Sequence, residues 1–542
     1  MRLSIMIGLA CLVSAMANTQ TTDPSLLYTG LPLVVINTNG QYIVDEPKIT
    51  ADIKIIYKGL SALNHYTDSG NIYDGHCGIE YRGYFSQGLP QKPYGFETRD
   101  ELGYNNNVSL LGMPRENDWI LLANYNDKTF MRNMLAFRLF EQMGHYAPRH
   151  HVCELILNYS YEGIYILTEK IKKDKNRVDI ATLDEDDNAG DSVTGGYIFK
   201  TDYYDDSNSW LSSYSPLDRP GGQVHFVYEY PKPDVITAEQ KNYLQDFIFS
   251  FETLLYSDAF DDLQNGYRAY IDVGSFIDYF IIGELSRNID AYKKSAYFYK
   301  DKDNKGGLIH RGPVWDFDWA WKNITDNSDI FNTTDGSGWA YHVNSCNDWP
   351  VAPVWIVRLM EDDLFQDELY TRYTTLRKTI LSEETLNHYI DSVALLVQDA
   401  QARHYERWPI LGINVGTPEV DYQPKSYAGE IIKFKNWIST RLSWLDANMP
   451  GELIVSNQEV SLNNPVRFRL FPNPVRNLLF VESDQLIKRI EIYNTTGILM
   501  NTRMTGSLYS LTVNVSQLPP GLYIVNTLLE NNAVVTRRIV VE

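Results

Sequence analysis

Residues 152–169 read VCELILNYSYEGIYILTE, and this stretch decides the fold class. Apolar residues fill most of 152–157 and 164–167, whereas Asn158 to Gly163 supply residue types that form turns. Two short apolar runs joined by such a turn predict a β-hairpin. The first half of the chain is therefore predicted to contain an antiparallel sheet.

Further strands are predicted on the N-terminal side of this hairpin. Apolar and polar residues alternate from residue 31 to 57, notably at 33–36 and 53–56, with the turn-rich Asn37 to Gly40 between these runs. Strand patterns recur at 77–84 and 92–98. Alternation with a period of two indicates strands that are buried on one face.

Helices dominate the second half of the predicted body. Residues 128–143 place Phe130, Met134 and Phe137 at helical spacing, and helical patterns return at 238–256, at 273–287 and over most of 354–449. A strand pair is predicted at 295–300 and 307–315. The fold class is therefore α+β, with a strand-rich N-terminal half and a helix-rich C-terminal half.

Length and charge restrict the function. The chain has 542 residues with 44% hydrophobic and 22% charged residues, which indicates two to four globular domains. Its 48 Lys and Arg residues against 69 Asp and Glu residues give a net charge of −21. Such a charge repels the phosphate backbone of nucleic acids and anionic membrane surfaces, so nucleic-acid binding is disfavoured.

The N-terminus predicts export. Arg2, an apolar run from Ile5 to Val13 and the small residues around Met16 are typical of a secretory signal peptide over 1–17, and the run is too short to span a membrane. Three cysteines then remain, Cys77, Cys153 and Cys346. They allow at most one disulfide, and the sequence does not choose the pair.

A second, smaller domain is predicted at the C-terminus. Residues 18–449 form the predicted body, and helical periodicity stops at 450–465, a predicted linker. Residues 466–542 hold 8 Lys and Arg against 5 Asp and Glu, a net charge of +3. Short alternating runs at 478–482, 487–493, 512–515, 522–529 and 534–541 predict a small all-β sandwich.

Three motifs give this tail a resemblance to a known domain. They are FPNP at 471–474, IEIYNTTG at 490–497 and LPPGLYIV at 518–525. In this order, at the end of the chain, they resemble the C-terminal sorting domain of the type IX secretion system. The resemblance implies a Bacteroidota-type source, handling by the type IX secretion machinery, and passage through the periplasm to the medium or the cell surface without a transmembrane segment.

Residues of the body suggest phosphoryl transfer, which needs a cation at the phosphates, acidic ligands for Mg²⁺ and a carboxylate near the attacking hydroxyl. Lys92 follows the turn at 86–88 on a predicted strand, and Arg82 precedes Gly83, which permits a close backbone approach. Either residue is equally typical of an ordinary surface strand. The sequence has no Gly-x-Gly-x-x-Gly and no Gly-Lys-Ser/Thr, so it lacks the usual phosphate-binding loops.

Asp316 and Asp318 are the strongest metal-ligand candidates. Side chains two residues apart in an extended stretch point the same way, and carboxylate oxygens suit Mg²⁺. Trp315, Phe317 and Trp319 surround them in sequence, and acids in apolar surroundings need a partner. A salt-bridged pair at a strand end is the structural alternative.

Seven segments give the body a family resemblance over roughly 31–445. Together, in this order, they resemble the CotH family, named for a spore-coat protein and regarded as atypical protein kinases. The segments are DEPKI at 45–49, YRGYFSQ at 81–87, QKPYGFETR at 91–99, DKTFMRN at 127–133, GIYILTEKI at 163–171, NID at 288–290 and VWDFD at 314–318.

The resemblance implies an atypical kinase-like body that uses ATP and Mg²⁺. Asp290 takes the role of the catalytic-loop aspartate, and Ser295 stands where a conventional kinase has a second metal-binding Asn, so Asp318 or Asn288 replaces that ligand. Arg132 supports the phosphate side or its own helix face. Glu169 reaches the nucleotide, pairs with Lys92 or is an ordinary strand end.

Three functions compete. The first is an exported kinase that transfers the γ-phosphate of ATP to Ser or Thr of secreted or surface proteins. The second is a non-catalytic surface protein for adhesion or glycan binding, for which 11 Trp and 38 Tyr provide stacking surfaces. The third, a glycoside hydrolase, needs two acids that face each other across about 5 to 9.5 Å, and Asp316 and Asp318 are too close in sequence for this.

Overall fold

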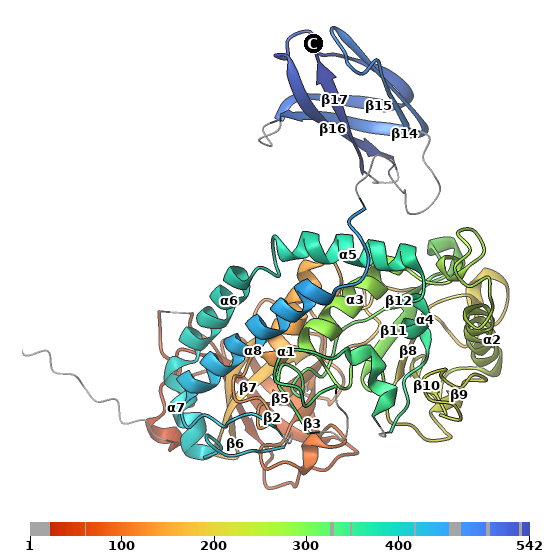
Figure 1. Ribbon diagram of the computed structural model, residues 1–542. Coiled ribbons are helices and arrows are strands. Elements are labelled where there is room, and N and C mark those ends of the chain that lie inside the picture. Colours follow the sequence, from red (N-terminus) through yellow and green to blue (C-terminus); the bar gives the residue numbers. More distant parts are fainter. Residues whose placement is uncertain are drawn as a thin grey trace, which may run out of the picture. The chain divides into compact units, whose positions relative to one another are not determined.

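The computed structural model describes residues 22–59, 61–325, 330–346, 349–416, 419–454, 468–494, 499–530 and 534–542 (Figure 1). The predicted signal peptide and most of the predicted linker lie outside these residues. The chain divides into two compact units between Leu453 and Ile454. No helix in the described ranges is long and apolar enough to cross a membrane.

The first unit begins with a closed seven-stranded barrel, in the order β1-β2-β3-β4-β5-β7-β6. The predicted hairpin is β6 and β7, which pair antiparallel, and the barrel closes where β1 pairs parallel with β6, Leu33 opposite Glu154. Alternate side chains fill its interior, among them Val34, Ile53 and Phe96. The strands are β1 Leu33–Asn37, β2 Ile49–Ile56, β3 Tyr73–Tyr81, β4 Tyr94–Arg99, β5 Asp118–Ala123, β6 His150–Leu157 and β7 Ser160–Glu169.

A second sheet of five strands follows, in the order β12-β11-β8-β10-β9. Its strands are β8 Tyr197–Thr201, β9 Ser209–Leu211, β10 His225–Tyr230, β11 Ala296–Lys300 and β12 Ile309–Arg311. The predicted strand pair corresponds to β11 and β12, which pair antiparallel. β12 ends at Arg311, so Val314 to Asp318 lie in a loop.

Eight α-helices are present in the described part of the first unit. The helix predicted at 128–143 begins later, at Arg132. The Asp127 carboxylate accepts hydrogen bonds from the backbone N–H groups of Thr129 and Arg132, and Phe130 between them has a left-handed φ of 64°. Asp272 is the N-cap of α3, and the helix ends at Ser286 because the backbone of Arg287, its C-cap, is left-handed. The helices are α1 Arg132–Gln142, α2 Ala238–Leu255, α3 Val273–Ser286, α4 Trp355–Leu359, α5 Asp363–Arg377, α6 Glu383–Leu396, α7 Gln398–Arg407 and α8 Tyr427–Asn448.

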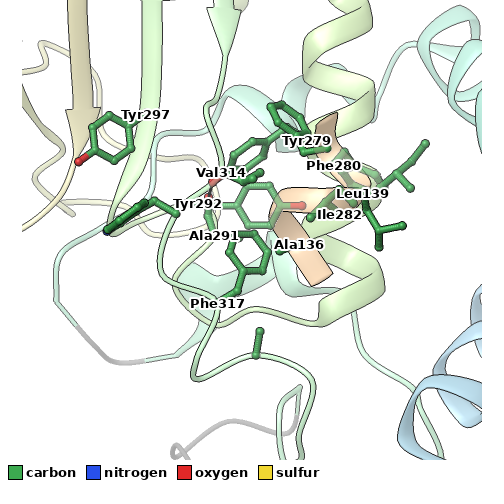
Figure 2. Packing of buried hydrophobic residues seen from close by; sticks show 14 of the residues in the cluster. Ala136, Leu139, Tyr279, Phe280, Ile282, Ala291, Tyr292, Tyr297, Val314 and Phe317 are labelled. Atoms are coloured by element: carbon green, nitrogen blue, oxygen red, sulfur yellow. Dashed lines mark hydrogen bonds between the residues drawn. The ribbon is translucent and has the colours of Figure 1, made fainter. Parts of the chain in front are cut away.

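One large apolar core joins the helices to the second sheet. Ala136 and Leu139 of α1 belong to the same buried cluster as Phe280 and Ile282 of α3 (Figure 2). Phe317, which stands between Asp316 and Asp318, is fully buried in this cluster. Burial of an aromatic ring stabilises by roughly 2 to 3 kcal/mol, so Phe317 anchors the acidic loop.

The second unit is a five-stranded antiparallel sheet (Figure 1). The predicted all-β character is confirmed: hydrogen bonds join all five strands, and β14 runs through two of the predicted strands and pairs with three neighbours. The strands are β13 Phe468–Phe471, β14 Leu478–Asn494, β15 Leu499–Asn514, β16 Gly521–Leu529 and β17 Val534–Val541.

The three cysteines of the described chain are buried, and they form none of the disulfides that the sequence allows. Burial raises the pKa of the Cys77 thiol to about 12 and that of Cys153 further still. Thiols held in this protonated form are poor nucleophiles.

Candidate active site

A cleft of about 370 Å³ lies between the barrel and the second sheet. The 82–86 turn after β3, the end of β5 and α1 contribute side chains from one side, and β8, β11 and the loops after α3 and β12 contribute the rest. Charged groups of both signs line it. They are Asp202, Asp290, Asp316 and Asp318, with Arg82, Lys200 and Lys294.

Hydrogen bonds hold the loop that carries Asp316 and Asp318. The backbone N–H of Phe317 donates to Asn133 Oδ1 at 2.7 Å. Ser295 Oγ donates to Asp316 Oδ2 at 2.8 Å. Asn126 Nδ2 donates to Asp318 Oδ2 at 3.1 Å. Both carboxylates therefore face the cleft on a fixed backbone, and Asp316 has the left-handed φ of 58° that Asp tolerates better than most residues.

Burial raises the pKa values of both carboxylates. Burial, and then the charge of Asp318, raise the pKa of Asp316 to about 7, although Arg82 and Ser295 oppose the shift. Burial likewise raises the pKa of Asp318, against the hydrogen bond from Asn126 and the charge of Lys322. Paired acids that resist ionisation are typical of functional sites, because a bound cation reverses the penalty.

This shift predicts a pH-dependent stability. An unfolded Asp loses its proton near pH 3.9, whereas Asp316 in the folded chain keeps it to about 7. The folded state therefore binds more protons in this window, and its stability falls as pH rises from about 4 to about 7. We expect Asp316→Asn to flatten this fall in metal-free buffer, as measured by the melting temperature at several pH values. Equal slopes for the variant and the parent protein would contradict the assignment.

Asp290 lies in the loop between α3 and β11. Its backbone N–H donates to Asn288 Oδ1 at 3.0 Å, and its carboxylate lies 3.4 Å from Lys294 Nζ. Asp290 Oδ1 is the buried oxygen of this ion pair, and it accepts no hydrogen bond within the described structure. A carboxylate oxygen with spare acceptor capacity in a cleft is suited to accept a hydrogen bond from a bound hydroxyl.

Arg82, in the turn after β3, and Lys200, on β8, are two of the cations that line the cleft. The Arg82 guanidinium lies 5.2 Å from the centre of the Trp315 ring, and its turn depends on Gly83, where an added Cβ would lie 2.2 Å from Ser86 Oγ. Lys200 Nζ of β8 lies 2.9 Å from Asp202 and 3.5 Å from Glu229. Burial lowers the pKa of Lys200, but the neighbouring acids outweigh this and keep the pKa well above its ordinary value.

Four predicted site residues lie outside the lining of this cleft. Lys92 precedes β4, and its ammonium donates to the Gln87 carbonyl at 2.6 Å, which braces the 86–88 turn. Glu169 is 1% exposed and pairs with Arg149, not with Lys92. Arg132 pairs with Asp127 at the start of α1. Asn288 donates to the Asp316 carbonyl at 3.4 Å, so it positions the loop that holds Asp316.

Sequence reasoning missed Asn126, Lys200, Asp202 and Lys294. They lie outside the seven segments that carry the family resemblance, and Asn126 and Lys294 are 168 positions apart in the sequence. Lys200 gave a usable signal, because it is the single charged residue in the apolar run YIFKT at 197–201. A lysine that is buried by such a run needs an acidic side chain beside it, because a buried charge is costly unless it is paired. A buried pair of charges in turn indicates a polar site.

The donor set fits Mg²⁺ that is bound together with a nucleotide. The described residues hold no group of three or more His, Cys, Asp or Glu side chains arranged for a metal ion. Mg²⁺ commonly takes one or two carboxylates and completes its octahedral shell with substrate phosphates and water. Asp316 and Asp318 could supply the protein ligands of such a site, since both carboxylates line the cleft.

Comparisons with known proteins identify the family. Residues 79–445 match the family described as CotH kinase protein, and this chain belongs to that family. Residues 469–542 match a secretion system C-terminal sorting domain of the type IX system, so the protein is exported to the cell surface or the medium. The inner spore coat protein H of Bacillus subtilis (strain 168) is 25% identical over 201 residues, which cover 37% of this chain and 49% of that relative. The match thus spans about half of the relative's length.

Proposed function

We propose that the protein is an exported protein kinase that transfers the γ-phosphate of ATP to Ser or Thr hydroxyls of secreted or surface proteins. One observation carries the proposal. Asp290, Asp316 and Asp318, from two separate loops, line one cleft together with Arg82, Lys200 and Lys294. Acids for a metal, an acid for the hydroxyl and cations for phosphates are the groups that phosphoryl transfer requires.

Each residue has a role in this reaction. The acceptor oxygen attacks the γ-phosphorus, the bond to the bridging oxygen breaks, and ADP leaves with the electron pair of that bond. Asp290 orients the acceptor hydroxyl and takes its proton. Arg82 binds phosphate oxygens at the edge of the cleft, and Lys200 adds positive charge there. Asp316 and Asp318 would hold Mg²⁺, which would supply positive charge against the charge that develops on the phosphates.

A radiolabel assay tests the proposal. The full-length protein is incubated with γ-labelled ATP, Mg²⁺ and surface proteins from a type IX-secreting bacterium. We expect label on phosphoserine or phosphothreonine, and none when a chelator removes Mg²⁺. Absence of label, together with absence of nucleotide binding by calorimetry, would remove the kinase assignment.

Exposed aromatic residues favour a second candidate, adhesion or glycan binding. Tyr84 is 76% exposed and its ring centre lies 4.5 Å from that of Tyr203, which in turn lies 5.0 Å from Trp349. Tyr84 and Tyr203 also line the cleft. Aromatic faces of this kind stack on sugar rings as readily as on peptides. Glycan binding that survives Asp290→Asn, without any phosphate transfer, would support this second function.

Deletion of the C-terminal unit should block export without unfolding the body. The two units have separate hydrophobic cores, so loss of residues 466–542 removes no core residue from the first unit. We expect the truncated protein to melt like the full-length body and to remain in the periplasm. Fractionation and thermal denaturation measure the two effects, and normal surface levels of the truncated protein would contradict the prediction.

A further inference from the structure

Arg311 is a buried cation that has no acid beside it. It is the last residue of β12 and is 3% exposed. Its guanidinium lies between two aromatic rings, 4.1 Å from the ring centre of Tyr279 and 4.0 Å from that of Phe298. Within the described chain no carboxylate pairs with Arg311, and its Nε and Nη1 donate no hydrogen bond.

This arrangement costs stability. A charged group in a protein interior loses its hydration, and contact with aromatic faces returns only part of that loss. Burial accordingly lowers the pKa of Arg311. An apolar side chain of similar size in place of a buried ion is often neutral or stabilising. Stability alone therefore does not account for an arginine at this position.

The remaining guanidinium nitrogen of Arg311 holds the loop that carries Asp290. Arg311 Nη2 donates to the Ala291 carbonyl at 2.8 Å, and the Tyr279 hydroxyl donates to the same carbonyl at 2.6 Å. Ala291 directly follows Asp290 and is 2% exposed. Both donors lie on regular elements, since Tyr279 belongs to α3 and the Arg311 N–H donates to Ser275 Oγ of the same helix at 3.0 Å. The carbonyl is therefore held by α3 and β12 together.

Hydrogen bonds inside the loop fix its shape, whereas bonds to other elements fix its position. The Asp290 carbonyl accepts the N–H of Lys294 at 2.9 Å, and the Asp290 N–H donates to Asn288 Oδ1 at 3.0 Å. Among the bonds to other elements, the Tyr292 hydroxyl donates to Glu284 of α3 at 2.9 Å. The two bonds to the carbonyl that follows Asp290 are nearer to it in sequence. A shift of that carbonyl therefore moves the Asp290 carboxylate most directly.

We propose that Arg311 is a positioning residue for phosphate transfer, which holds the Ala291 carbonyl and thereby places the Asp290 carboxylate in the cleft. This inference rests on the proposed function, because it deepens the assignment of Asp290 as the base. Among the described residues, the lining of the cleft does not include Arg311, so Arg311 acts through the loop and not on a substrate. A base must lie within about 2.6 to 3.2 Å of its proton donor, and a misplacement of about 1 Å can lower a rate about 10²-fold.

Arg311→Met in the full-length protein tests this role. Met is flexible and packs well against aromatic rings, and the Ala291 carbonyl keeps its bond from Tyr279. We expect kcat for phosphate transfer to fall by about tenfold to a hundredfold, because the base is less well placed. The KM for Mg-ATP should not change, since the groups assigned to the nucleotide are intact. The melting temperature should stay the same or rise, because the substitution removes a buried charge that has no acid partner.

Arg358→Met is the matched control. Arg358 also stacks on an aromatic ring, 3.9 Å from the centre of Phe260, but it pairs with Glu361 and belongs to α4, outside the lining of the cleft. The same chemical change at this position should leave kcat unchanged. It should also lower the melting temperature or leave it the same, because it removes an arginine that has an acid partner.

A double variant tests whether the two donors act on the same carbonyl. Tyr279→Phe together with Arg311→Met leaves the Ala291 carbonyl without either donor. We expect the double variant to lower kcat by more than the product of the two single effects, because each donor alone still holds the carbonyl.

Three results would overturn the role of Arg311 alone, in a parent protein that transfers phosphate. They are an unchanged kcat in Arg311→Met, a fall in kcat that is matched by a large fall in the melting temperature, and a higher KM for Mg-ATP with the same kcat. The last result would place Arg311 in nucleotide binding. Absence of transfer by the parent protein would instead remove the proposed function, and the positioning role with it.

Discussion

Asp290→Asn is expected to lower the rate of phosphate transfer by about 10² to 10⁴, the usual contribution of general-base assistance. The carboxylate of Asp290, whose Oδ1 accepts no hydrogen bond within the described structure, is the group placed to accept the hydroxyl proton, and an amide cannot accept it. Nucleotide binding should persist, because Asp316, Asp318 and Arg82 are assigned to the metal and the phosphates. Single-turnover kinetics measure the rate, and calorimetry measures the affinity for Mg-ATP.

The matched control is Asp258→Asn, which makes the same chemical change at an exposed acid outside the cleft. Its rate should equal that of the parent protein. Equal loss of ATP binding and of transfer in Asp290→Asn would show that Asp290 holds the metal or the nucleotide and does not act as the base.

Asp316→Asn should reduce transfer by about 10³ or more, since loss of a metal ligand removes several kcal/mol of transition-state stabilisation. Asn is preferred to Ala here because it tolerates the φ of 58° and can still accept the Ser295 hydroxyl. The metal-free variant should melt at the same temperature as the parent or higher, because the substitution removes a carboxylate that repels Asp318.

Mg²⁺ provides the second readout for Asp316. Mg²⁺ with a non-hydrolysable ATP analogue should raise the melting temperature of the parent protein and not that of the variant. A large loss of metal-free stability together with retained activity would mean that Asp316 forms a structural ion pair, the alternative that the sequence left open.

The sequence predicts the elements of this fold better than their assembly. The hairpin at 152–169 and the helix after Asp272 follow from local patterns, and both are present. The closure of the barrel is not local, because β1 pairs with β6 across more than one hundred residues, and no periodicity reports such a pairing. The end of β12 at Arg311 was missed for a similar reason, since Val314 and Trp315 are buried by packing in the helical core and not by a sheet.

The sequence also predicts the residues of the candidate site better than their positions in space. Asp290, Asp316 and Asp318 belong to short motifs, and the structure brings all three to one cleft. Lys92 and Glu169 belong to equally recognisable segments, yet their side chains are engaged by the Gln87 carbonyl and by Arg149. A motif identifies the residue type, whereas the direction of a side chain depends on contacts from distant segments. Asn126 and Asp202 show the converse, because geometry alone places them in the cleft.

In the proposed reaction, the cleft around Asp290 and Asp316 transfers phosphate. The most direct measurement is phosphoamino-acid analysis after incubation of the full-length protein and of Asp290→Asn with γ-labelled ATP, Mg²⁺ and surface proteins. We expect labelled phosphoserine or phosphothreonine with the parent protein, and labelling lower by a factor of about 10² or more with the variant. Equal labelling by both proteins would contradict it, because the label would then come from a site other than this cleft.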